Sequence, residues 1–165
     1  ILTNQRLSSS HMSSLKFWVI LAVGFSLFLI GIGLWAEKSH PGKSAIEISQ
    51  TLIDLGKVKV SETKEADFFL KNSGQKPLQL FNISSSCGCV TAKIIRADGW
   101  ESAEFGMHSR SKSVIEVAPN EQIKIKVIYR PYLMPVRGLI SREVYLSTND
   151  PARPRLTLKI QAQVS

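Results

Sequence analysis

Apolar and polar residues alternate along most of the chain after residue 45. The clearest stretch is 156–164, where every second residue from Leu156 to Val164 is apolar. Residues 122–130 repeat the pattern, with Lys124 and Lys126 opposite the apolar side chains. A period of two residues is typical of antiparallel strands that bury one face. The pattern therefore predicts half-buried strands, and it places on one buried face Ile123, Ile125, Val127 and Tyr129.

Turn residues separate these alternating runs. They occur at 72–74, 118–121 and 149–151, and Pro119-Asn120 fits the centre of a type II turn because Asn tolerates a positive φ. The runs predict strands near 46–53, 65–72, 77–84, 90–95, 113–118, 122–130, 139–147 and 155–164. Short strands with turns between them and no helix favour an all-β fold. We therefore expect an antiparallel β-sandwich of seven or eight strands over residues 45–165.

Residues 96–112 interrupt the alternation and predict an inserted loop. The segment combines charged and small residues with Trp100, Phe105, Met107 and His108. A long loop inside a compact domain often has a function of its own. Its large apolar side chains favour packing, either on the sandwich or on a partner. The candidates for partner binding are Trp100, Phe105 and Met107.

Residues 17–36 form a continuous apolar run without a charged side chain. Twenty residues in a helix span about 30 Å, the thickness of the hydrocarbon core of a bilayer. The run exceeds the usual apolar part of a cleaved signal peptide, and Leu34 makes Leu34-Trp35-Ala36 a poor cleavage site. We predict a short leader at 1–16, a transmembrane signal anchor at 17–36 and a polar linker at 37–44.

The predicted anchor suggests a location and a packing surface. A short basic leader usually stays in the cytoplasm, so we expect a single-pass protein of the inner (cytoplasmic) membrane with its C-terminal domain in the periplasm or outside. Small residues along the helix allow close packing with another helix, although a lone anchor facing lipid fits nearly as well. The small residues are Ala22, Gly24, Ser26, Gly31 and Gly33.

Charge and motif content limit the classes of function. The chain of 165 residues has a net charge of +8, and the part after residue 36 contains 19 basic and 13 acidic residues, a net charge of +6. Its lysines are spread along strands, which favours solubility over an anionic partner, and we expect no nucleic-acid partner. No metalloprotease, hydrolase, nucleotide or dinucleotide motif is present, so we expect no enzyme.

Both cysteines lie in the stretch SSSCGCVT, residues 84–91, and leave three alternatives open. They are small apolar residues at a bent junction, ligands of a soft ion such as copper with Met107 and His108, or a redox pair. A disulfide is the least favoured structural role. On an extended strand, Cα atoms two residues apart lie about 6.6 Å from each other, near the upper limit for a bridge.

Several short motifs together resemble a known family. The chain is similar to bacterial Hydin-like immunoglobulin-fold domains, and more narrowly to an extracytoplasmic family with a Ser-Cys-Gly-Cys-Thr motif. It departs from that pattern at Leu55, Val90 and Asn120. The resemblance covers about residues 45–164 and implies an immunoglobulin-like sandwich, but no activity. The matching positions are Asp54, Gly56, Asn72, Gly74, Pro77, Leu78, Ser86, Cys87, Gly88, Cys89, Pro119, Glu121 and 148–151.

These observations together lead to two hypotheses on function. The first is a membrane-anchored, non-catalytic interaction module, an accessory subunit that contacts other membrane proteins and the lipid bilayer. The second is a membrane-tethered protein that binds copper or another soft metal through Cys87 and Cys89.

Overall fold

A computed structural model describes residues 18–19, 21, 23–26, 42–109 and 113–165. The chain divides into two units, Ile1–Pro41 and Gly42–Ser165. In the first unit the described residues are helical, with Trp18, Val19 and Phe25 exposed. The predicted leader and most of the predicted anchor lie outside the described residues, as do Ala22, Gly31 and Gly33. Among the residues that are described, no helix is long and apolar enough to cross a membrane.

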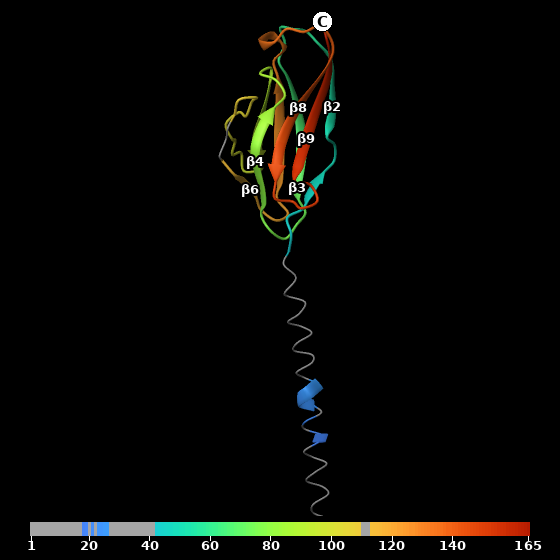
Figure 1. Ribbon diagram of the computed structural model, residues 1–165, viewed down its shortest axis with the longest axis vertical. Helices are drawn as coiled ribbons and strands as arrows, with labels where there is room; N and C mark the ends of the chain where they lie inside the picture. The colour runs from blue at the N-terminus through green and yellow to red at the C-terminus, as the bar shows by residue number, and fades with distance from the viewer. Residues whose placement is uncertain (1–17, 20, 22, 27–41, 110–112) are drawn as a thin grey trace, which may run out of the picture. The chain divides into compact units, whose positions relative to one another are not determined.

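The second unit is a β-sandwich of two sheets (Figure 1). The four-stranded sheet has the order β1-β3-β7-β5, and the five-stranded sheet has the order β2-β9-β8-β4-β6. A 3-10 turn, η1 (Pro131–Leu133), follows β7. The strands are β1 (Ile46–Ile48), β2 (Leu52–Val58), β3 (Lys64–Asn72), β4 (Leu78–Ser85), β5 (Val90–Arg96), β6 (Ile115–Val117), β7 (Gln122–Tyr129), β8 (Gly138–Thr148) and β9 (Arg155–Val164).

The alternation in the sequence matches the buried faces of the strands. Between the two sheets lie the predicted apolar positions of β7 and β9, each at most 5% exposed. Asn120 has a φ of 64°, and the Glu121 N–H donates to the Ala118 carbonyl at 3.0 Å, so the predicted turn at Pro119-Asn120 is confirmed. The core positions of these two strands are Ile123, Ile125, Val127, Tyr129, Leu156, Leu158, Ile160, Ala162 and Val164.

The first predicted strand was wrong in its extent. Residues 46–53 do not form one strand, because the chain bends at Ser49 and Thr51 and passes from one sheet to the other. β1 pairs with β3, whereas β2 pairs in parallel with β9. The sandwich is therefore mixed and not antiparallel throughout, and its described residues form nine strands instead of the expected seven or eight. The irregularity between Asp54 and Lys57 contains Gly56 at a φ of 67°, which marks a bulge in this edge strand.

Buried polar side chains fix the end of the sandwich where residues 42–46 join it, which we call the base. Asp150 accepts hydrogen bonds from the backbone N–H of Ile46 at 2.9 Å and of Ala152 at 2.8 Å. Asn72 donates to the Val117 carbonyl at 3.0 Å. Gly74 lies against the backbone of Lys43, since a Cβ there would be 2.2 Å from the Lys43 oxygen. The residues at the base that carry the family resemblance, Asn72, Gly74 and Asp150, therefore have a structural role.

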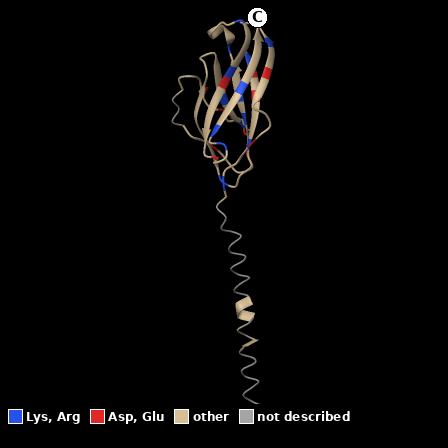
Figure 2. Cartoon of the chain, turned by 45° about the vertical axis from the view of Figure 1, so that its right-hand side comes forward, with Lys and Arg blue, Asp and Glu red and all other residues tan. Residues whose placement is uncertain are grey.

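Charged side chains on the outer face of the four-stranded sheet pair with each other. Lys126 Nζ lies 2.7 Å from Glu65 Oε2, and Lys124 Nζ lies 3.2 Å from Asp67 Oδ2. Figure 2 shows that basic and acidic residues are interspersed over the strands of the sandwich. This mixture agrees with the expectation that the lysines along the strands serve solubility.

Candidate functional site at the tip of the sandwich

The two cysteines form a disulfide bond with each other, in contrast to the expectation that this was the least favoured arrangement. They do not lie on an extended strand. Residues 86–89 connect β4 to β5 and so pass from the five-stranded to the four-stranded sheet, and the Val90 N–H donates to the Cys87 carbonyl at 3.3 Å. This turn brings the two Cα atoms to 5.3 Å, well inside the range that a disulfide requires.

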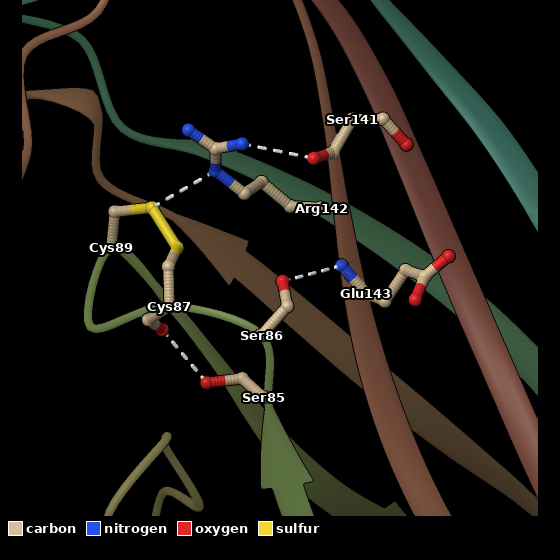
Figure 3. The surroundings of a disulfide bond; sticks show 7 residues. All are labelled: Ser85, Ser86, Cys87, Cys89, Ser141, Arg142 and Glu143. Carbon is tan, nitrogen blue, oxygen red and sulfur yellow. Dashed lines mark hydrogen bonds between the residues drawn. A yellow bond between two sulfur atoms is a disulfide. The ribbon is translucent and has the colours of Figure 1, made fainter.

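Neighbouring side chains hold the turn in place (Figure 3). The Ser85 hydroxyl donates to the Cys87 carbonyl at 2.8 Å, and the Ser86 hydroxyl accepts from the backbone N–H of Glu143 at 3.0 Å. Arg142, on β8, places its Nε 3.4 Å from the sulfur of Cys89. The disulfide is therefore built into the sandwich and faces a guanidinium group.

A buried tyrosine lies close to the same turn. Tyr129 pairs with Val90, the residue after Cys89, and is only 1% exposed. Its hydroxyl has no hydrogen-bond partner among the described residues. Burial raises the pKa of Tyr129, while the positive charge of Arg142 acts in the opposite direction.

The segment that follows β7 exposes an unusual amount of apolar surface. We call residues 130–139 the tip loop. It contains Pro131, which is buried, and five large hydrophobic side chains that are 45% to 78% exposed. The loop begins beside the disulfide, because the Arg130 N–H donates to the Cys89 carbonyl at 2.8 Å. The five exposed side chains are Tyr132, Leu133, Met134, Val136 and Leu139.

Basic residues lie at the same end of the sandwich. Gly138 pairs with Val164, and Val164 pairs with Val58, so the ends of three strands lie side by side. The residues next to these positions include Arg137 and Lys59, both exposed. The tip loop thus presents an apolar surface with positive charges at its margin. η1 and the label of the C-terminus mark this end in Figure 1, and the cyan start of the second unit lies at the opposite end of the sandwich.

The described part of the predicted insertion, residues 96–109, packs along the sandwich. Phe105 exchanges two backbone hydrogen bonds of 2.8 Å with Ala92 and is 6% exposed, so it contributes to the core. Ser102 also donates to the Ile94 carbonyl, and residues 101–105 therefore cover the edge of β5. Trp100 stays partly exposed and lies 5.0 Å from the Arg96 guanidinium.

A groove lies between this segment and β6. Its lining includes Trp100, Phe105 and Ser109 from this segment and Val114 and Glu116 from the chain at β6. Two of the three predicted partner-binding residues therefore share one hollow, while Met107 is exposed outside its lining.

The structure joins the two cysteines but does not show the other predicted metal ligands beside them. Met107 and His108 are exposed, and the described structure records no contact between either side chain and a cysteine sulfur. No group of three or more potential ligands of the His, Cys, Asp or Glu type occurs in the described part of the chain. Copper binding remains a prediction about the reduced pair.

The sequence analysis overlooked the tip loop and Arg142. A signal for the loop was present, since 131–136 reads PYLMPV and places a run of apolar residues between two strands where turn residues are usual. No sequence signal marks Arg142, because only the pairing of β8 with β4 brings it to the cysteines.

Comparison with protein families gives one match. Residues 46–101 match the family described as a protein of unknown function (DUF1573). This segment contains β1 to β5 and the Cys87–Cys89 turn, and it is about a third of the chain. The resemblance to Hydin-like domains and the narrower resemblance to the family with the Ser-Cys-Gly-Cys-Thr motif stay predictions. A comparison with curated proteins found no match.

Comparison with solved structures identifies the fold. A protein of unknown function from Porphyromonas gingivalis W83 is similar with a TM-score of 0.55 and 21% identity, over 73% of this chain and 47% of that chain. A family 123 glycoside hydrolase from Clostridium perfringens has a TM-score of 0.52 and 6% identity, over 74% and 27%. PapD-like domain 7 of human CEP192 has a TM-score of 0.48 and 18% identity, over 73% and 84%.

These identities are low enough that the likenesses show the fold alone. The two structures with TM-scores above 0.5 show that other proteins share this sandwich fold, and its immunoglobulin-like character stays a prediction. The chain spans about half the length of the Porphyromonas protein.

Proposed function

We propose that this chain is a membrane-anchored, non-catalytic interaction module that docks a partner protein through its tip loop. The observation that supports the proposal is the cluster of five exposed hydrophobic side chains within residues 132–139. Scattered single apolar side chains are normal on a protein surface, whereas large exposed apolar side chains concentrated in one short segment favour a site that another molecule binds. In this role the domain is an accessory subunit of a larger membrane complex.

The chemistry of the tip loop favours a protein with an apolar groove and an acidic margin. Tyr132, Leu133 and Leu139 are large enough to fill pockets in a partner, and aromatic anchors are common at the centre of interfaces. Arg137 and Lys59 add positive charge at the margin, which would steer an acidic partner toward the loop.

Membrane anchoring is supported by the apolar run at 17–36. Residue 42 joins the sandwich at the base, and the tip loop is at the other end of the same unit. The docking surface is thus far from the point at which an anchor is attached, which suits a protein partner better than the lipid around that anchor. We place the anchor in the inner membrane and the sandwich in the periplasm or outside.

Co-purification from native membranes tests this proposal. The full chain would be extracted in mild detergent and purified, and the bound proteins would be identified and quantified by mass spectrometry. We expect a membrane protein at a constant ratio to the chain. Changing Leu133 and Leu139 together to Ser should reduce its recovery by about tenfold or more, because each removes a buried apolar contact from the interface.

Phe69→Ser is the matched control, since Phe69 is 47% exposed but lies on the outer face of the four-stranded sheet. We expect this variant to retain the partner. Equal recovery from wild type and the double variant would contradict the proposal.

A further inference from the structure

The Cys87–Cys89 disulfide closes a loop with one intervening residue, Gly88. The stabilisation that a disulfide gives by constraining the unfolded chain grows with the size of the loop. A bond across two positions therefore adds little to the stability of the sandwich. A role for this disulfide is therefore to be sought in its reactivity and not in its contribution to stability.

Arg142 supplies a fixed positive charge beside one of the two sulfurs. Its Nε lies 3.4 Å from Cys89 Sγ, and its Nη1 donates to the Ser141 carbonyl at 3.0 Å, which holds the guanidinium in place (Figure 3). A guanidinium stays charged at every relevant pH. If the bond is broken, this charge stabilises a thiolate on Cys89 and lowers the pKa of that thiol.

The two cysteines are both buried, but the residues differ in exposure as well as in their distance from a charge. Cys87 is 7% exposed, whereas Cys89 is 1% exposed. An external thiolate reaches the more exposed cysteine first, and the sulfur that departs is then the one beside Arg142. Thiol–disulfide exchange is faster when the leaving thiolate is the more stable one. Access and charge therefore favour the same direction of attack.

From this geometry we propose that Cys87–Cys89 is a thiol–disulfide exchange site that accepts electrons from a dithiol. A thiolate of the dithiol attacks Cys87 Sγ, the Cys87–Cys89 bond breaks, and Cys89 leaves as a thiolate beside Arg142. The second thiolate of the dithiol then attacks the first sulfur of the dithiol, which is bonded to Cys87 Sγ in the mixed disulfide. The bond to Cys87 breaks, and the released Cys87 thiolate takes a proton from water. Two electrons pass to the protein, and the dithiol becomes a disulfide.

The other charged and titratable groups around the turn do not place a positive charge beside Cys89 Sγ, so stabilisation of the leaving thiolate depends on Arg142. From β7, Tyr129 is neutral because burial raises its pKa, and Arg130 approaches Cys89 through its backbone while its guanidinium pairs with Glu104. From β8, Glu143 contacts Ser86 through its backbone N–H, and its carboxylate accepts from Tyr145.

The adjoining surface indicates the class of substrate. The tip loop starts at Arg130, whose backbone N–H donates a hydrogen bond to the Cys89 carbonyl. The loop exposes Tyr132, Leu133 and Met134. A polypeptide with two cysteines next to apolar residues fits such a surface. This inference goes beyond the proposed docking function and does not depend on it, since a small dithiol tests the exchange without any partner.

The first experiment measures reduction of the folded full chain in detergent by dithiothreitol. Free thiols would be trapped by alkylation at successive times and counted by intact mass. We expect reduction in the absence of denaturant. Arg142→Gln should slow it by about three- to tenfold, since the leaving thiolate loses its stabilising charge. The control Arg153→Gln, an exposed arginine at the base, should leave the rate unchanged.

A second measurement separates charge stabilisation from folding. In Cys87→Ser the remaining Cys89 thiol would be titrated by its alkylation rate against pH. We expect the midpoint to rise by about one unit when Arg142→Gln is added. Glutathione, which has one thiol, should form its adduct on Cys87, as seen by peptide mapping after acid quenching.

Three results would overturn the inference. They are reduction of the wild-type bond only at denaturant concentrations that unfold the chain, an Arg142→Gln variant with unchanged rate and unchanged thiol midpoint, and a glutathione adduct on Cys89. None of these results bears on docking through the tip loop, so the two proposals fail separately.

Discussion

Asp150 and Asn72 show at the residue scale what the recurring polar motifs of this chain do. Both are buried, and their side chains bond to the backbone of segments far away in the sequence, residue 46 for Asp150 and residue 117 for Asn72. Buried polar groups without partners cost free energy, so these bonds fix one arrangement of the base. Sequence alone marked both residues through a family resemblance, but not their structural role.

Replacement of Asp150 tests this role. We expect Asp150→Ala to lower the free energy of unfolding by about 2–3 kcal/mol, because two backbone N–H groups lose a charged acceptor. Asp150→Asn keeps one acceptor oxygen and should cost less. Equilibrium chemical denaturation measures both. Equal stability of the alanine variant and wild type would show that the base does not depend on this carboxylate.

At the scale of elements, the segment at 100–105 protects an edge of the four-stranded sheet. Its bonds to Ala92 and Ile94 occupy backbone groups of β5 that would otherwise be exposed to another strand. Arg130, which follows β7, holds this segment through a bidentate ion pair with Glu104, with N–O distances of 3.0 Å. Alternation of apolar and polar residues predicted most of the strands. The backbone pairing of 100–105 with β5 could not be predicted from the sequence, because the segment has no repeating pattern.

The Glu104–Arg130 pair predicts a pH dependence. The hydrogen bond from Arg130 lowers the pKa of Glu104 below its ordinary value of 4.5, so the pair stabilises the fold above that value and loses its effect as the pH falls through the lowered pKa. Glu104→Gln should cost about 0.5–1 kcal/mol at pH 7, a modest amount because water screens this partly exposed pair.

Chemical denaturation at pH 7 and below pH 3 measures this difference. We expect the wild type and Glu104→Gln to become equally stable at the lower pH. Glu47→Gln, on an exposed position of β1, is the control and should change stability little at either pH. A cost that stays constant with pH would show that the carboxylate charge is not the cause.

At the scale of the whole molecule, the sandwich has two unlike ends. The base is made of buried polar bonds, and the tip combines an apolar loop, basic residues and a disulfide beside Arg142. Periodicity was enough to predict the sandwich and most strand positions. It did not predict the parallel pairing of β2, the disulfide or the exposed loop, because these depend on which distant segments meet.

Site-specific crosslinking tests the docking role of the tip most directly. A photoreactive side chain would replace Leu139, at 78% exposure, or Phe69 as the control, and cells would be irradiated before extraction. We predict one discrete crosslinked membrane protein from position 139, absent from position 69 and lost when Leu133→Ser is added. A partner crosslinked from position 69 and not from 139, or no crosslink from 139, would contradict the account.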